Sequence, residues 1–190
     1  EITTKKDSHV DIESDVITVD GQVVNTKQQY YVKFHKPKGY VTAVEDANHP
    51  VVMDLLPPEY IKMGVVPVGR LDKDTVGLLL LTNDGELNHR LISPKWKVDK
   101  VYYAKIDKKV TDEDVAKFKA GITLDDGYLC KEAKLEILNA TDEGSEVMVT
   151  IQEGKFHQVK RMFEAVGKSV VYLKRTELLE KVWLNGHYNI

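Results

Sequence analysis

Short apolar runs, separated by polar and turn-forming residues, are the dominant pattern along this chain. Runs of this length, many of them alternating apolar and polar positions, predict strands that are buried on one or both faces. A hairpin is predicted over 15–25, where the pattern turns at Asp20-Gly21. Residues 30–44 predict two strands around a turn at 36–39. Further strands are predicted over 63–69, 77–83, 98–107, 133–139, 145–153 and 169–175.

Helical periodicity is confined to four short segments. Prolines end the first of them, and a glycine closes each of the last two. The last segment is amphipathic, with apolar residues three and four positions apart. The predicted helices are 51–56, which ends at Pro57-Pro58, and 86–92, 111–121 and 156–167. Because strands outnumber helices and most connections are short, the pattern predicts an α+β fold with a mainly antiparallel mixed sheet and flanking helices.

The composition is that of an ordinary globular protein: of 190 residues, 42% are hydrophobic and 30% charged. The length fits one domain, or one domain and a fragment of another. A single cysteine, Cys130, excludes a disulfide framework and fits a reducing compartment, so we expect a cytoplasmic protein. No apolar run approaches the roughly 20 residues of a membrane span. The chain begins with Glu1 rather than Met, so we expect a piece of a longer protein.

Positive charge is concentrated in segments, although the formal net charge is −3. Residues 88–105 and 152–175 each carry a net charge of +4, and three more lysines lie within 33–38. If these segments meet in space, they form a basic surface that attracts phosphates. If they do not meet, they are three separate solvated faces, and the charge pattern leaves both interpretations open.

The densest cluster of charge lies between two apolar runs, in the stretch VGRLDKDTVGLLLLTNDGE at 68–86. Its first half is spaced like a calcium loop, but Val76 offers no oxygen ligand and Asn83 replaces the closing glutamate, which excludes calcium. An aspartate phosphotransferase loop would follow its strand directly, whereas Gly69-Arg70-Leu71 intervenes here, so this class is disfavoured. A hairpin loop that uses aspartate for its turn geometry also fits the spacing.

This stretch resembles the signature loop of the pseudouridine synthases, in the branch typified by RsuA. Three more segments resemble that branch, in its order and spacing: KPKGYVTAVEDANHPVVMDLL at 36–56, DKVYYAKI at 99–106 and EGKFHQVKRMFEAVG at 153–167. The resemblance implies a pseudouridine-synthase catalytic domain over 28–190. It also implies that residues 1–27 are the C-terminal remnant of a small RNA-binding domain and its linker. After Arg175 the chain departs from the family's pattern.

The resemblance implies three catalytic residues. Asp72 is the carboxylate that acts near the anomeric carbon, as nucleophile or as proton acceptor. Lys160 is the cation that keeps this carboxylate charged. Tyr102 packs on the uracil once the base has left its stack. A rigid loop between two buried strands would hold Asp72 in place, which explains the charged stretch between apolar runs.

The resemblance also implies residues that bind the RNA. Arg70 helps to displace the target nucleotide from its stack, because the reacting atoms are buried in stacked RNA. Gln158 is expected to order the site, and Arg161 is the second choice for the cation beside the carboxylate. Contacts with backbone phosphates are expected from lysines of the basic segments, Lys36, Lys38 and Lys97. No metal and no cofactor are expected, since the isomerisation needs no redox carrier.

The expected function is the isomerisation of one uridine in ribosomal RNA. The segments EDANHPVVMDLL and LISPKWKVDKVYYAKI resemble the small-subunit enzyme more than its large-subunit relatives, so we expect a small-subunit target. The expected partner is ribosomal RNA or a partly assembled small subunit, with no membrane association, and the protein is expected to be a monomer. Two alternatives stay open: a large-subunit rRNA enzyme, and an RNA-binding module without activity.

Overall fold

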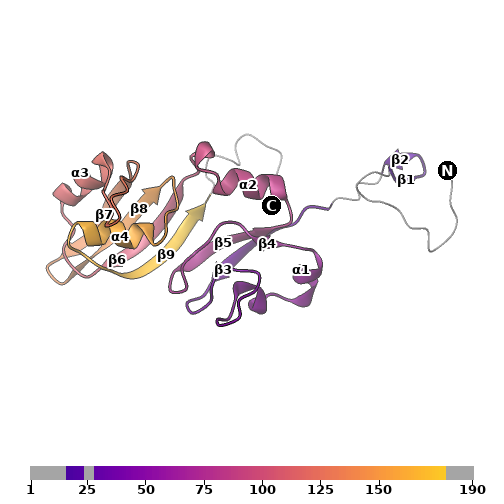
Figure 1. Cartoon of the computed structure of the whole chain (residues 1–190), viewed down its shortest axis with the longest axis horizontal. Coiled ribbons are helices and arrows are strands. Elements are labelled where there is room, and N and C mark those ends of the chain that lie inside the picture. The colour runs from indigo at the N-terminus through magenta and orange to yellow at the C-terminus, as the bar shows by residue number, and fades with distance from the viewer. Residues whose placement is uncertain (1–15, 24–27, 179–190) are drawn as a thin grey trace.

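A mixed sheet of seven strands is the main feature of the fold (Figure 1). The computed structural model describes residues 16–23 and 28–178. The strand order is β3-β5-β9-β6-β8-β7, β4 also pairs with β5, and only the contact between β5 and β9 is parallel. The strands are β3 (Tyr31–Lys36), β4 (Val66–Pro67), β5 (Val76–Thr82), β6 (Lys100–Ile106), β7 (Lys134–Thr141), β8 (Gly144–Ile151) and β9 (Val170–Leu178). The predicted α+β fold is confirmed.

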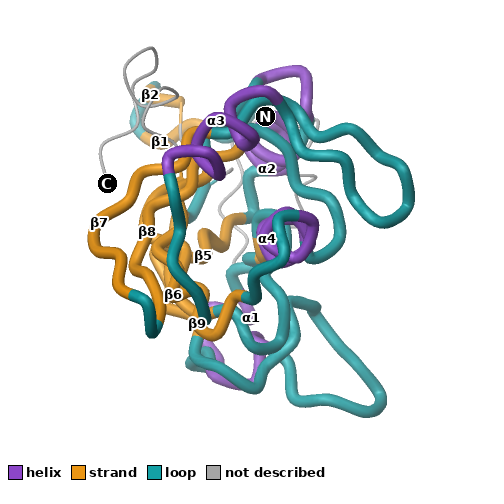
Figure 2. The backbone as a smooth tube through the Cα atoms, turned by 90° about the vertical axis from the view of Figure 1, so that its left-hand side faces the viewer, coloured by secondary structure: helices purple, strands orange, loops and turns teal. Residues whose placement is uncertain are grey.

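The helices are short and lie between the strands in sequence. The α-helix α4 packs against β9 and α3 packs against β7, and the turned view shows α4 beside the layer of strands (Figure 2). The α-helices are α1 (Pro58–Lys62), α2 (Gly85–Ile92), α3 (Asp112–Ala120) and α4 (Gln158–Ala165), and the 3-10 helices are η1 (Val52–Leu55) and η2 (Pro94–Trp96). The hairpin predicted at Asp20-Gly21 forms a separate two-stranded sheet of β1 (Thr18–Val19) and β2 (Gln22–Val23).

The apolar run of β5 is buried on both of its faces. Successive side chains of a strand point to opposite faces. Leu79 and Leu81 therefore enter the main core, whereas Leu80 enters a second core with Leu87 and Leu91 of α2. This placement explains why the run is continuously apolar rather than alternating, as expected of a strand covered on both sides.

Several predicted elements differ in the structure. No second strand follows the turn after β3, because Val41 pairs with the loop at Pro50 and Val52 instead, through hydrogen bonds of 3.0 Å. The strand predicted over 63–69 is reduced to β4. The helix predicted over 51–56 is the short 3-10 helix η1. The prolines do not end all helical structure, since Pro58 is the first residue of a second helix, α1, where the missing N–H of proline costs nothing. The strand predicted to end at 175 continues to Leu178 as β9.

The two halves of the sheet meet where β5 begins. Gly77 of β5 lies against Arg175 of β9, and a Cβ atom at position 77 would come within 2.2 Å of the Arg175 carbonyl oxygen. The φ of Gly77 is +103°, a conformation that other residues rarely adopt. Arg175 is buried, and its Nε donates to the Leu78 carbonyl at 2.7 Å. Only glycine therefore permits this close approach of the two backbones.

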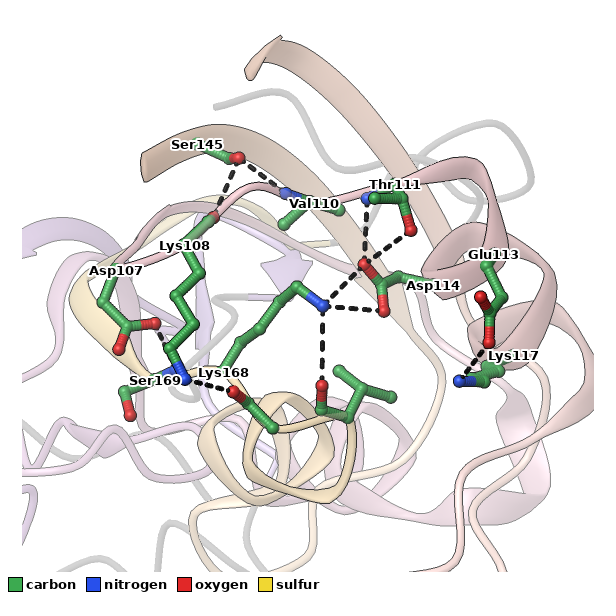
Figure 3. Close-up of polar contacts among 12 residues, drawn as sticks. Asp107, Lys108, Val110, Thr111, Glu113, Asp114, Lys117, Ser145, Lys168 and Ser169 are labelled. Carbon is green, nitrogen blue, oxygen red and sulfur yellow. Dashed lines mark hydrogen bonds and ion pairs between the residues drawn. The ribbon is translucent and has the colours of Figure 1, made fainter. Parts of the chain in front are cut away.

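Buried polar contacts tie α3 to the turn that follows α4 (Figure 3). The ammonium of Lys168 lies 2.9 and 3.0 Å from the two carboxylate oxygens of Asp114. Asp114 also caps α3 by accepting from the Thr111 N–H at 2.9 Å. The Ser145 hydroxyl accepts from the Val110 N–H at 2.8 Å and donates to a carbonyl of the same loop. Together these bonds fix α3 and α4 relative to the sheet.

We predict that Gly77→Ala destabilises the protein by roughly 3 kcal/mol or more, because the added Cβ forces β5 and β9 apart. The matched control is Gly127→Ala, which also has a positive φ of +82° but no atom within 4 Å of the added Cβ. This control should lose only about 1 kcal/mol. Urea unfolding followed by circular dichroism measures both. Equal losses in the two variants would contradict the importance of the close approach.

Candidate active site

A cleft of about 410 Å³ opens between the loop that precedes β5 and the loop that precedes α4. Its lining includes residues 70–73 on one side, residues 154–159 on the other, and Tyr102 of β6 between them. These segments are far apart in sequence, and the sheet brings them together because β9 lies between β5 and β6. The cleft thus collects four of the candidate residues, Arg70, Asp72, Tyr102 and Gln158.

Lys160 of α4 forms ion pairs with two aspartates of the β5 loop. Its Nζ lies 3.2 Å from Asp72 Oδ2 and 2.6 Å from Asp74 Oδ1. Burial alone would lower the pKa of Lys160, but the hydrogen bond to Asp74 and the charge of Asp72 raise it above its usual value. Burial likewise opposes the charge of Asp74, yet the hydrogen bond from Lys160 lowers the pKa of that carboxyl. The cation expected beside Asp72 is therefore in contact with it and stays protonated.

Lys36 is fully buried beneath the same loop. Its ammonium donates to the carbonyls of Pro37, Lys73 and Thr75 at 3.1, 3.3 and 2.8 Å. Desolvation lowers its pKa to about 8, although the charges of Asp74 and Asp72 act in the opposite direction. The expectation that Lys36 contacts RNA phosphates is therefore wrong, because its charge is directed inward. It joins the end of β3 to both sides of the charged loop.

Thr42 fixes the residue that precedes Asp72. Its buried hydroxyl donates to the Leu71 carbonyl at 2.9 Å and accepts from the Leu71 N–H at 3.1 Å. One side chain thus satisfies both backbone polar groups of a residue that has no partner strand at this point. Together with Lys36, this contact makes the backbone on both sides of Asp72 a fixed support.

Tyr102 and Arg70 differ in exposure. Tyr102 is 7% exposed and belongs both to the main core and to the lining of the cleft. Arg70 is exposed at the cleft. The tyrosine can therefore present part of its ring to a ligand from a rigid strand, whereas the arginine is free to move with an incoming nucleic acid.

Gln158 and Arg161 have internal partners. Gln158 is 4% exposed: its amide oxygen accepts from the Lys155 N–H at 2.9 Å, and its nitrogen donates to the buried Glu153 at 2.7 Å. Arg161 pairs with Asp125 and Asp126 rather than with Asp72. Arg161 is therefore not the cation beside Asp72, because its guanidinium is already neutralised. Gln158 shapes the loop before α4 and also lines the cleft, so its contact with substrate stays a prediction.

Lys38 and Lys97 are exposed, and neither lines the cleft. Lys38 lies in the turn after β3, and Lys97 follows η2 in a left-handed conformation with a φ of 48°. Both side chains are accessible to a large ligand that extends beyond the cleft. Their contact with RNA phosphates stays a prediction.

The structure adds contacts that the sequence pattern did not indicate. His157 Nε2 lies 3.7 Å from Asp72 Oδ1, and Asp74 shares Lys160 with Asp72. Thr42 had no distinguishing signal, since a threonine between apolar residues is typical of a strand. Phe156 lines the cleft yet is 74% exposed, whereas its spacing from Phe163 is that of a buried helix face.

Two kinds of feature, a membrane-spanning helix and a metal-binding cluster, are absent from the described residues. No helix there is both long and apolar enough to cross a bilayer. No group of three or more histidine, cysteine, aspartate or glutamate side chains in the same residues is arranged to hold a metal ion.

Residues 30–165 match the family of RNA pseudouridylate synthases. The chain is 44% identical to an uncharacterized RNA pseudouridine synthase, YtzG, of Bacillus subtilis, over 90% of this chain and 71% of that protein. It is 42% identical to the ribosomal large subunit pseudouridine synthase B of Bacillus subtilis, over 86% of this chain and 67% of that protein. It is 36% identical to the ribosomal small subunit pseudouridine synthase A of Escherichia coli, over 88% and 80%.

A solved structure described as a pseudouridylate synthase has the same fold, with a TM-score of 0.73 and 34% identity. The likeness covers 94% of this chain and 75% of that one. The expected pseudouridine-synthase fold is confirmed by this similarity. The cleft between the β5 loop and α4 is therefore carried on a scaffold shared with a known pseudouridylate synthase.

Lys36 predicts a pH dependence of stability. Its folded pKa of about 8 lies below the unfolded value of 10.5, so between these values the unfolded state binds more protons. The free energy of unfolding should therefore rise with pH over this interval, by an amount on the order of 3 kcal/mol. We compare the free energy of unfolding of the wild type with that of Lys36→Met. The difference between them should not change with pH below about pH 7.5, and above that pH it should shift in favour of the wild type. Urea titrations across this range measure it, and a flat difference throughout would contradict it.

The two hydrogen bonds of Thr42 predict that two conservative substitutions at this position differ in their effect on stability. Thr42→Val keeps the shape but leaves the buried N–H and carbonyl of Leu71 without the hydroxyl, which should cost about 1–3 kcal/mol. Thr42→Ser keeps the hydroxyl and should cost less than about 1 kcal/mol. Thermal unfolding of the two variants measures the split. If serine, which keeps the hydroxyl, were as destabilising as valine, which lacks it, the importance of the two hydroxyl bonds would be contradicted.

Proposed function

Because this chain belongs to the RNA pseudouridylate synthase family, we propose that Asp72 is the catalytic carboxylate and that the substrate is one uridine of ribosomal RNA. Members of this family isomerise uridine in RNA, and this coarser activity is assigned to the chain with the family. The observation that carries the finer proposal is the carboxylate of Asp72 in the cleft, 3.2 Å from the ammonium of Lys160.

The reaction defines what the site must do. The bond between C1′ and N1 of the uridine breaks, the base turns, and a new bond joins C1′ to C5. The proton on C5 is lost, and N1 gains one, so no oxidant or reductant is needed. An ionised carboxylate can attack C1′ as nucleophile or can accept the C5 proton. Asp72 fits both roles, since its side chain is accessible from the cleft.

Lys160 supports the reaction by keeping a carboxylate charged in a closing site. A nucleobase that fills the cleft removes water and would raise the pKa of a lone carboxyl group. The raised pKa of Lys160 means that its positive charge persists over the whole physiological range. Asp74 takes the shorter contact with Lys160, so it holds the ammonium in position beside Asp72.

Tyr102 and Arg70 complete the proposed site. Tyr102 lies on a strand paired on both sides, so its ring offers a fixed surface for the uracil. Arg70 is exposed two residues before Asp72, where it can enter the space that the extruded nucleotide leaves. Both roles are supported by their position at the cleft.

The target uridine is proposed to lie in small-subunit ribosomal RNA. The support comes from two segments, residues 45–56 and 91–106, that resemble the small-subunit enzyme. The second candidate is a large-subunit uridine, which is favoured by the 42% identity to the large subunit pseudouridine synthase B of Bacillus subtilis. The substrate is then ribosomal RNA or a partly assembled subunit in the cytoplasm, bound by a single copy of the chain. Residues 1–27 are proposed to be the tail of a small RNA-binding domain with its linker.

We predict that Asp72→Asn folds and binds RNA normally but loses isomerase activity by about 10⁴-fold or more, because it removes the reactive charge and keeps the size. Release of tritium from RNA labelled at C5 of uridine measures the reaction, since the C5 hydrogen is displaced when the new bond forms. Substantial release of tritium by Asp72→Asn would contradict the assignment of Asp72 as the catalytic carboxylate. Release by neither variant nor wild type, on any ribosomal RNA, would sink the proposed function itself.

Asp74→Asn is the matched control for the same measurement. Its carboxylate shares Lys160 but lies on the more exposed side of the loop, with a side chain that is 56% exposed against 26% for Asp72. It should keep activity within about tenfold of wild type, because Lys160 can still pair with Asp72. A loss equal to that of Asp72→Asn would reassign the reaction to the pair rather than to one carboxylate.

A further inference from the structure

Phe156 is the most conspicuous exposed aromatic side chain at the cleft. It is 74% exposed, although it lines the same cleft as Asp72. Aromatic rings are normally buried, and an exposed one in a binding cleft lacks part of the packing that would stabilise it. The ring is not explained by the core, since Val159, Met162 and Phe163 supply the buried face of α4.

The ring of Phe156 is already stacked on one side. The ring centroids of Phe156 and His157 lie 3.8 Å apart with an angle of 17° between their planes. Neighbouring residues can stack in this way because His157 adopts a left-handed backbone conformation, with a φ of 49°. A non-glycine residue in this region is strained, and such strain is concentrated at functional sites.

The loop that carries Phe156 is fixed from below. The Gln158 N–H donates to the Lys155 carbonyl at 3.1 Å, while the Lys155 N–H donates to the Gln158 side chain at 2.9 Å. Gln158 is anchored in turn by Glu153, a buried carboxylate that also accepts from Tyr128 at 2.9 Å. The exposed ring is therefore presented by a rigid turn rather than by a loose loop.

The surroundings of the ring favour one class of ligand. Arg70, Lys73 and Lys155 line the same cleft, so an aromatic surface lies among positive charges. Stacked aromatic rings with adjacent cations are the pattern that binds unstacked nucleobases and their phosphates. His157 contacts both the ring of Phe156 and the carboxylate of Asp72, with its Nε2 3.7 Å from Asp72 Oδ1, so it links Phe156 to the proposed reaction centre.

We propose that the Phe156–His157 pair is a stacking subsite for a nucleobase next to the target uridine. This inference rests on the proposed function for the identity of the target, but the subsite itself needs no chemistry. Extrusion of the uridine leaves its neighbours on the strand unstacked, and the outer face of Phe156 receives one of them. The subsite recognises the flat surface of a base rather than its hydrogen-bonding edge, so it contributes affinity more than sequence choice.

Binding of two short RNAs by fluorescence anisotropy tests the subsite. One is a labelled octamer of uridine, and the other is a matched octamer of abasic ribonucleotides, which keeps every phosphate and lacks every base. Phe156→Ala should weaken binding of the uridine octamer about tenfold, the size expected for one base–aromatic stack. It should leave binding of the abasic octamer unchanged, and Phe156→Trp should restore the wild-type affinity.

Tyr172→Ala is the matched control, since Tyr172 is an aromatic residue of β9 that is 39% exposed and does not line the cleft. It should bind both octamers as the wild type does. The inference is overturned if Phe156→Ala loses nothing, if it loses equally on both octamers, or if the wild type shows no preference for the octamer with bases. These binding measurements do not depend on isomerisation. A result that rules out the stacking subsite is therefore distinct from a result that rules out the proposed activity.

Discussion

Three backbone carbonyls, from Pro37, Lys73 and Thr75, converge on the buried ammonium of Lys36. This cluster joins the end of β3 to the charged loop just before β5. The loop cannot shift without leaving either the ammonium or the carbonyls unpaired in a buried place, which costs several kcal/mol. The close approach of Gly77 to Arg175 lies at the same point of the sheet, so the position of the loop and the joining of the two half-sheets depend on each other.

The electrostatics of the cleft follow from this support. Asp72 and Asp74 are two negative charges on one short loop, and Lys160 of α4 lies between them at 3.2 and 2.6 Å. Because the loop is fixed by Lys36 and Thr42, and α4 is fixed through the turn at Lys168, the ammonium and the carboxylates are preorganised before any ligand enters. A preorganised charge needs no rearrangement during a reaction, which is the main way in which a protein site stabilises a charged transition state.

Local patterns in the sequence predicted most of the strands and the helix α4, because the periodicity of an element depends only on the residues within that element. The apolar run of β5 and the glycine that ends α3 are examples. The sequence could not predict the burial of Lys36, since a lysine followed by Pro37 is typical of an exposed turn, and its carbonyl partners belong to a distant segment. The start of the helix predicted over 156–167 was wrong for a related reason. Phe156 has the spacing of a helical residue, but α4 begins only at Gln158. The pairing of Lys160 with Asp72 was accessible through family resemblance alone.

The proposal that this chain modifies ribosomal RNA through Asp72 can be tested by mapping pseudouridines in cells. Ribosomal RNA from cells that lack the gene is compared with RNA from cells that regain the wild-type gene or the Asp72→Asn gene. We predict that one position in small-subunit RNA loses its pseudouridine in cells without the gene, that the wild-type gene restores it, and that the Asp72→Asn gene does not. An unchanged map, or restoration by Asp72→Asn, would contradict the account.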